Sequence, residues 1–275
     1  MNTFNLGPLS IQGAHLMLLL CLMVAAGAGR LAGRRAKVSI VPVLTDMVLV
    51  GLVAARTVFV VTWFEQYRAA PLTMLDIRDG GFTAWAGLAA AAALGVWRAT
   101  RYKALREPLL AGVLAGTAAW FISGAPAMLQ VQPGKGVPAV TVTTLSGAAI
   151  ALPALAAGGP AVINLWATWC APCIREMPVF AAAQNRERAI RFIFANQGEA
   201  GATVALFLRQ HALKMDNVVL DSASATARAV GASGTPTTLF FDARGQLVDA
   251  HLGPLSDASL AAKLVKIRPA AVAAR

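Results

Sequence analysis

The stretch INLWATWCAPC, residues Ile163–Cys173, decides how the C-terminal half of this 275-residue chain folds. An apolar segment changes, at its first cysteine, into a segment with a proline in the position of a first helical turn. The pattern predicts a buried strand over Ala161–Ala167 followed directly by a helix over Ala171–Arg188. Cys170 then lies at the N-terminus of the helix, and Cys173 lies one turn further along.

This placement of the two cysteines indicates thiol chemistry. Unpaired N–H groups and the helix dipole stabilise a thiolate at a helix N-terminus, so the pKa of Cys170 is expected below the roughly 8.5 of a free thiol. We predict that Cys170 is the nucleophile and that the deeper Cys173 resolves the mixed disulfide. Two alternatives are an inert core pair and a zinc site. A zinc site needs two more Cys or His ligands, and the three histidines are solitary.

Strand-like and helical patterns alternate around this junction, which predicts a central sheet covered by helices. A segment rich in Pro and Gly precedes them, so we expect a linker at 129–137 and a soluble domain at 138–275. The other strands are expected at Ala139–Thr144, Phe192–Ala195, Asn217–Leu220, Thr237–Asp242 and Gln246–His251. The other helices are expected near Thr203–Ala212, Ala223–Val230 and Ser256–Ile267.

The composition of the chain indicates that part of it lies in lipid. Hydrophobic residues make up 57% of the chain and charged residues 13%, against about a quarter charged in soluble proteins. Four apolar runs predict an anchor domain of about four transmembrane helices over residues 1–128. The runs are Leu9–Gly29, Val38–Phe64, Gly81–Trp97 and Pro108–Met128.

Basic residues cluster in the first and third connections between these runs, which predicts that both connections are cytoplasmic. The clusters are Arg30, Arg34, Arg35, Lys37 and Arg98, Arg101, Lys103, Arg106. The net charge of +11 is therefore assigned to membrane topology, with no nucleic acid as partner. With four spans the C-terminal domain lies outside the cytoplasm, whereas three spans would place it in the reducing cytosol.

The string WCAPCIREMP, Trp169–Pro178, resembles the TlpA/ResA group of periplasmic thiol:disulfide reductases in the thioredoxin superfamily. The resemblance continues in NQGE, Asn196–Glu199, and in GTPTTLFF, Gly234–Phe241, and covers essentially residues 133–268. It implies an α/β thioredoxin-like domain and a thiol:disulfide oxidoreductase without a cofactor or metal.

The resemblance also implies roles for further residues. Pro236 is expected to be a cis-proline facing the cysteine pair, with the backbone of Thr235 binding a substrate segment, unless it is an ordinary trans turn proline. Glu176 is expected to be buried near the sulfurs and to relay a proton, unless it is a solvated helix residue. Trp169 is expected to form an apolar rim beside Cys170, and Trp166 is expected to lie in the core.

The N-terminal segment resembles the first part of prolipoprotein diacylglyceryl transferase over roughly residues 4–124. The similarity rests on Asp46–Val60 and on Ile77–Thr83. Trp85 stands where a histidine of that enzyme is expected, and Thr117–Gly124 lacks the corresponding arginine and asparagine. The resemblance therefore implies a retained scaffold without transferase chemistry. Asp46 and Arg56 within the second run are costly in lipid and call for partners.

Together these patterns predict an inner-membrane protein whose periplasmic domain reduces disulfides of exported proteins, for instance in cytochrome c maturation. The alternatives are an oxidase that donates its disulfide, a copper-site assembly factor, which would need a further His or Met ligand, and lipid handling by the anchor. Membrane lipid is an expected partner. Cys21 is the only cysteine of the anchor, so a separate membrane thiol reductant is expected to recharge the pair.

We expect reporters fused after Arg35 and after Arg101 to read out as cytoplasmic, and a reporter fused after Gln132 as periplasmic. The basic clusters hold the first two positions inside. Paired alkaline phosphatase and fluorescent protein fusions measure this. A cytoplasmic signal after Gln132 would contradict the four-span topology and the substrate class together.

Overall fold

The computed structural model describes residues 3–6, 9–34, 36–68, 70–124 and 135–268. Its contacts divide the chain into two compact units. One unit joins Glu65–Gly80 to the C-terminal part from Val131, and the other consists of Asn2–Phe64 and Gly81–Gln130. The predicted domain boundaries, 1–128 and 138–275, stay a prediction. In the contact-based division Glu65–Gly80 groups with the C-terminal part.

The predicted linker at 129–137 falls outside the described residues up to residue 134. Its last residues join the sheet of the C-terminal unit. Gly136 forms a bridge with Gln246, and the N–H of Leu247 donates to the carbonyl of Lys135 at 2.9 Å. Backbone pairing with the sheet therefore begins within the segment that the sequence predicted to be a linker.

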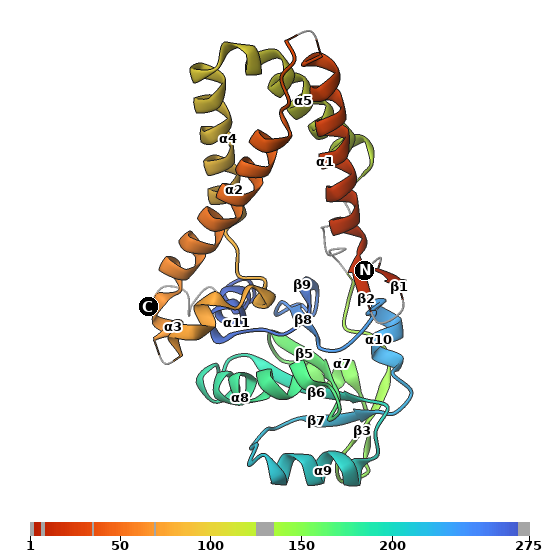
Figure 1. The fold of residues 1–275 in the computed structure, drawn as a ribbon. Helices are drawn as coiled ribbons and strands as arrows, with labels where there is room; N and C mark the ends of the chain where they lie inside the picture. The colour runs from red at the N-terminus through yellow and green to blue at the C-terminus, as the bar shows by residue number, and fades with distance from the viewer. Residues whose placement is uncertain (1–2, 7–8, 35, 69, 125–134, 269–275) are drawn as a thin grey trace. The chain divides into compact units, whose positions relative to one another are not determined.

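The N-terminal unit is built from four long helices. They are α1 (Gly13–Ala32), α2 (Val41–Thr62), α4 (Ala84–Arg101) and α5 (Arg106–Ile122). Helix α1 packs against α5, and α2 packs against α4 (Figure 1). Each helix follows one predicted apolar run, but the first run starts differently, because strands β1 (Thr3–Leu6) and β2 (Leu9–Gln12) pair as an antiparallel hairpin before α1. The end of the fourth run, beyond residue 124, lies outside the described residues.

Two stretches of the described chain are long and apolar enough to cross a membrane. They are Val41–Thr62 and Lys103–Ile122, whereas the apolar helix over Leu16–Ala32 is shorter. The expected count of four spans stays a prediction.

Small residues let the helices of this unit approach closely. A Cβ on Gly87 of α4 would lie 2.8 Å from the carbonyl oxygen of Gly51 on α2. A Cβ on Gly116 of α5 would lie 2.9 Å from the Cβ of Ala25 on α1. Helices in lipid associate through such close packing, since lipid tails are as apolar as leucine.

The charged residues of the second apolar run have partners, as their cost in lipid requires. Arg98 on α4 donates to the carboxylate of Asp46 at 2.8 Å. Arg56 donates to the carbonyl of Gly81 at 2.8 Å, and its guanidinium lies 5.8 Å from the ring centre of Phe82. These contacts lie within the N-terminal unit.

The C-terminal unit contains a seven-stranded sheet of order β4-β3-β7-β6-β5-β8-β9. Its strands are β3 (Thr141–Thr144), β4 (Ala149–Ala151), β5 (Ala161–Trp166), β6 (Arg191–Gln197), β7 (Val218–Asp221), β8 (Thr237–Phe241) and β9 (Leu247–Leu252). Strands β5, β6 and β7 are parallel, and β8 runs antiparallel to β5 and pairs with β9. This arrangement confirms the thioredoxin-like α/β fold.

Helices cover both faces of this sheet, because the side chains of a strand alternate between the faces. All six residues of β5 are buried. Val162 and Trp166 pack with helices α8 (Ala171–Arg186), α9 (Gly201–Gln210) and α11 (Asp257–Leu264). Ile163 and Leu165 pack with α7 (Leu152–Ala156) and α10 (Ala225–Val230) on the other face. Asn164 consequently points to the face that carries α8.

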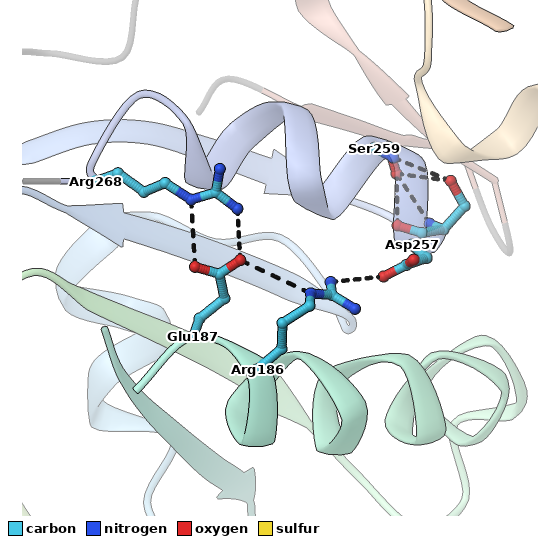
Figure 2. A network of polar contacts seen from close by, with 6 residues as sticks. Arg186, Glu187, Asp257, Ser259 and Arg268 are labelled. Carbon is cyan, nitrogen blue, oxygen red and sulfur yellow. Dashed lines mark hydrogen bonds and ion pairs between the residues drawn. The ribbon is translucent and has the colours of Figure 1, made fainter. Parts of the chain in front are cut away.

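Ion pairs join the end of α8 to the first residue of α11 and to Arg268, four residues beyond the end of α11 (Figure 2). Arg186 donates to Asp257 at 2.9 Å, and Arg268 donates through Nε to Glu187 at 3.2 Å. Ser256 caps α11 through a reciprocal box with Ser259, which satisfies two of the free N–H groups of the first turn. Helix α11 is thus held against the helix that carries the cysteines.

Most predicted elements of this domain lie within three residues of the observed ones. Strand β4 and helix α7 were not predicted, because three and five residues are too few to show a periodic pattern. The predicted extended segment Ala139–Thr144 contains β3. The connection Glu65–Gly80 also holds short helices that the sequence did not reveal: the end of α3 (Phe64–Tyr67), η1 (Pro71–Leu75) and η2 (Ile77–Asp79).

We expect Gly87→Val to destabilise the N-terminal unit by about 1–3 kcal/mol, because the new side chain would push α4 away from α2. Gly27→Val is the matched control, since a Cβ at Gly27 meets nothing within 4 Å. Thermal unfolding in detergent compares the two variants. Equal melting temperatures for both would show that the close approach of α2 and α4 contributes little.

Candidate active site

The cysteine pair lies where strand β5 ends and helix α8 begins. Cys170 is the N-cap residue of α8, and its sulfur forms a disulfide with that of Cys173 at 2.01 Å. The two sulfurs meet because two intervening residues bring Cys173 one helical turn beyond the cap. The structure therefore shows the oxidised form of the pair.

The two cysteines are placed differently. Cys170 is 4% exposed and Cys173 is fully buried. The backbone N–H of Cys173 points at the Cys170 sulfur over 3.3 Å, and such a donor stabilises a thiolate at that position. Both features favour Cys170 as the sulfur that meets a substrate.

Glu176 lies one turn beyond Cys173 and is 1% exposed, so the interpretation as a solvated helix residue is wrong. Its carboxylate accepts hydrogen bonds from the Asn164 amide and from the backbone N–H of Leu255, each at 2.9 Å. Burial raises the pKa of Glu176 to about 7, and these two hydrogen bonds partly oppose that rise. The carboxyl group can therefore give or take a proton near neutral pH.

The amide of Asn164 is suited to both protonation states of Glu176. Its Nδ2 donates to Glu176 and to the hydroxyl oxygen of Thr238 at 3.1 Å, while its buried Oδ1 has no partner among the described residues. Turning the amide over would let Oδ1 accept from the protonated carboxyl of Glu176 and from the Thr238 hydroxyl. One side chain can thus satisfy the ionised and the neutral carboxyl group.

Pro236 follows a cis peptide bond from Thr235, as the family resemblance implied, and the trans-turn alternative is wrong. The next residue, Thr237, pairs with Leu165 near the end of β5. Strand β8 therefore begins at the same end of the sheet at which β5 ends and the cysteine pair follows. The contact of Thr235 with a substrate stays a prediction.

The two tryptophans near the pair differ as expected. Trp169 is 71% exposed beside Cys170, which allows it to form part of a contact surface. Trp166 is fully buried and packs against Phe207, so it belongs to the core.

Glu199 also shapes the site, and its role was not predicted, although it lies in the quoted segment NQGE. Its carboxylate accepts from the backbone N–H of Thr168 at 2.7 Å and from the Asn196 amide at 2.6 Å. It thereby joins the loop before Cys170 to the end of β6. An acidic residue directly after a buried strand was the available signal.

The turn 253–256 was missed as well. The N–H of Gly253 donates to the carbonyl of Pro236 at 2.9 Å, and Leu255 reaches Glu176. Gly253 has a φ of 111°, which favours glycine, and Pro254 follows it. The Gly-Pro pair marked a turn in the sequence but not its partners.

Comparison with known proteins gives two family matches. Residues 132–264 match the Redoxin family, and residues 2–121 match the prolipoprotein diacylglyceryl transferase family. The N-terminal match agrees with the resemblance seen in the sequence.

Curated relatives match the C-terminal half of the chain. The thiol-disulfide oxidoreductase ResA of Bacillus thuringiensis is 31% identical over 142 residues, which cover 51% of this chain and 81% of that protein. The thiol:disulfide interchange protein DsbE of Pseudomonas fluorescens is 31% identical over 124 residues, 45% of this chain and 68% of that protein. A solved thiol:disulfide interchange protein of Chlorobium tepidum aligns with a TM-score of 0.43 and 23% identity, over 50% of this chain and 98% of that one.

The buried carboxyl group of Glu176 should make stability depend on pH. Between its ordinary value of 4.5 and about 7, the folded protein keeps a proton that the unfolded chain has lost, so stability falls as pH rises through this window. Glu176→Gln cannot ionise and should be more stable than the wild type at pH 8, by about 3 kcal/mol at most.

Thermal unfolding of both oxidised proteins at pH 4 and at pH 8 measures this difference. The advantage of the Gln variant should shrink towards pH 4, where both side chains are neutral. An equal difference at the two pH values would show that Glu176 ionises normally in the folded protein.

Proposed function

The chain belongs, through its C-terminal half, to the ResA-type thiol-disulfide oxidoreductases, and on this basis we propose that it reduces disulfide bonds of exported proteins on the periplasmic side of the inner membrane. The observation that carries the proposal is the Cys170–Cys173 disulfide at the start of α8, with the buried carboxyl group of Glu176 one turn beyond. A nucleophile, a resolving thiol and a proton carrier stand in sequence on one helix.

In the first step the Cys170 thiolate attacks a disulfide of the substrate. A bond forms between the Cys170 sulfur and one substrate sulfur, and the second substrate sulfur leaves as a thiolate that takes up a proton. The slightly greater exposure of Cys170, 4% against none for Cys173, and the N–H of Cys173 support this role.

In the second step Cys173 attacks the Cys170 sulfur and releases the substrate. The proton of the Cys173 thiol passes to Glu176, whose pKa of about 7 makes it an acceptor at neutral pH. The pair ends as the Cys170–Cys173 disulfide, and two electrons have moved to the substrate.

We assign substrate contact to Trp169 and Thr235. The indole of Trp169 is exposed next to Cys170. Thr235 lies directly before the cis bond to Pro236, where the family resemblance implies that its backbone offers strand-like hydrogen bonds to a substrate segment. Cytochrome c precursors are one substrate class that the resemblance to the TlpA/ResA group supports.

We place the N-terminal unit in the inner membrane as an anchor of four helices. Two stretches with the length and composition of membrane spans, and the match to a membrane transferase family, support membrane association. Cys21 is buried in α1 and unpaired, so it has no internal partner with which to resolve a mixed disulfide. A separate membrane reductant is therefore proposed to reduce the Cys170–Cys173 disulfide.

We expect Cys173→Ser to accumulate mixed disulfides with substrates in cells, because the nucleophile remains and the resolving thiol is gone. Cys170→Ser is the matched control and should trap no partner. Non-reducing electrophoresis and mass spectrometry identify the linked cysteine. Partners trapped through Cys173 in the Cys170→Ser protein, and none in the other variant, would reverse the two roles.

A further inference from the structure

The turn 253–256 connects three segments that lie far apart in the sequence. Gly253 donates to the carbonyl of Pro236 at 2.9 Å, and Leu255 donates to the carboxylate of Glu176 at 2.9 Å. The third contact comes from Ser256, whose hydroxyl donates to Asp79 at 2.7 Å. The turn thus joins the cis-proline and the active-site carboxyl group to the connection between α2 and α4.

Asp79 is buried and hydrogen-bonded at this contact. It ends η2, is 4% exposed and also accepts a hydrogen bond from the hydroxyl of Tyr67 at 3.1 Å. Buried carboxylates are retained where such donors compensate their desolvation. Asp79 therefore has the surroundings of a fixed contact and differs from the exposed residues around it.

The backbone beside Asp79 also lies on the thioredoxin-like domain. A Cβ at Gly80 would lie 2.9 Å from the ring of His251, and a Cβ at Gly253 would lie 4.0 Å from the carbonyl of Arg78. His251 in turn bonds through Nε2 to the carbonyl of Pro254 at 3.3 Å. The connection thus contacts the turn through backbone and side chain together.

We propose that Glu65–Gly80 is a docking element of the thioredoxin-like domain, and that Asp79 is a positioning residue for Glu176, acting through Ser256 and Leu255. This inference rests on the proposed function of Glu176 as proton carrier. It gives the connection between two anchor helices a part in the reaction of a domain that begins more than fifty residues later.

The mechanism follows from hydrogen-bond geometry. A hydroxyl has one proton to donate, and the Ser256 hydroxyl donates it to the carboxylate of Asp79. The same hydroxyl oxygen accepts a hydrogen bond from the N–H of Ser259 at the start of α11. This holds residue 256 in place, and Leu255 shares a peptide bond with it. The N–H of Leu255 therefore keeps a good distance and angle to Glu176.

The pKa of Glu176, which burial raises to about 7, lies near neutral pH. The carboxyl group of Glu176 accepts from Asn164 of β5 and from Leu255 of the turn, and Cys173 lies one turn earlier on the same helix. Beside the turn, burial lowers the pKa of His251 to about 4, so it is neutral in this range. Asp249 on β9 forms ion pairs with Lys263 and Lys266.

The test compares Asp79→Ala with Glu65→Ala in the full chain in detergent. Glu65 lies on the same connection, but its side chain is 73% exposed and pairs with Arg68. We expect Asp79→Ala to speed amide hydrogen exchange across residues 253–256 at least threefold. It should also move the Glu176-dependent midpoint of thiol–disulfide exchange to higher pH, by about half a unit, because the Leu255 bond lowers that pKa. Glu65→Ala should change neither value.

Two further variants keep the result interpretable. Tyr67→Phe removes one donor to Asp79 conservatively and should produce a smaller change of the same sign, which serves if Asp79→Ala does not fold. Glu176→Gln identifies the limb of the pH profile that Glu176 controls.

If Glu176→Gln abolishes that limb while Asp79→Ala and Tyr67→Phe leave exchange and midpoint at wild-type values, the docking inference is wrong and the proposed function stands. If Glu176→Gln keeps the wild-type profile, the proton relay is wrong. Hydrogen exchange in the Asp79→Ala and Tyr67→Phe proteins then still decides whether the connection docks.

Discussion

The arrangement of the C-terminal unit depends on the hydrogen bonds that the buried carboxyl group of Glu176 requires. This group is almost fully buried, and an unpaired buried carboxylate is too costly for a folded protein to retain. Its partners come from β5, through Asn164, and from the turn before α11, through Leu255. The sheet, the helix that carries the cysteines and the turn before the last helix must therefore be positioned correctly for the carboxyl group of Glu176 to receive both hydrogen bonds. The same burial raises its pKa to about 7 and so makes it useful for chemistry.

The contacts between α8 and α11 help to keep the partners of Glu176 in place. The ion pairs of Arg186 and Glu187 join the end of α8 to the start of α11 and to the segment that follows α11. The leucines of α11 lie in the same apolar cluster as the two cysteines. These ion pairs are partly exposed and contribute modestly to stability. Their effect is on geometry, because they fix the direction in which α11 leaves the turn that holds Glu176.

The helices of the N-terminal unit are held together by close packing and by paired charges. On our proposal its helices lie in lipid, where apolar burial does not drive helices together, and glycine contacts such as Gly51 with Gly87 provide close packing. The charges of Asp46 and Arg56 are met by Arg98 and by the carbonyl of Gly81. Residues 2–121, which include these helices, match the prolipoprotein diacylglyceryl transferase family. On our proposal, the connection Glu65–Gly80 also contributes to the redox domain.

Local features of the sequence determined the strand-to-helix junction, the position of Cys170 at the helix N-terminus and the helical character of the four apolar runs. These follow from short-range patterns, because a strand, a cap and a helical turn involve neighbouring residues. The cis bond before Pro236 was anticipated only through the family resemblance, since the residues alone allowed a trans turn.

Only the tertiary structure decided the surroundings of Glu176. The family resemblance implied a buried Glu176, whereas the residues alone also allowed a solvated helix position. Its two partners, Asn164 and Leu255, lie 12 and 79 positions away in the sequence. The contact of Asp79 with Ser256 spans 177 positions, and no periodic pattern carries such information. Length and polarity of the apolar runs likewise did not determine the number of spans. The sequence thus specified which groups the site contains, and long-range packing specified which of them are buried together.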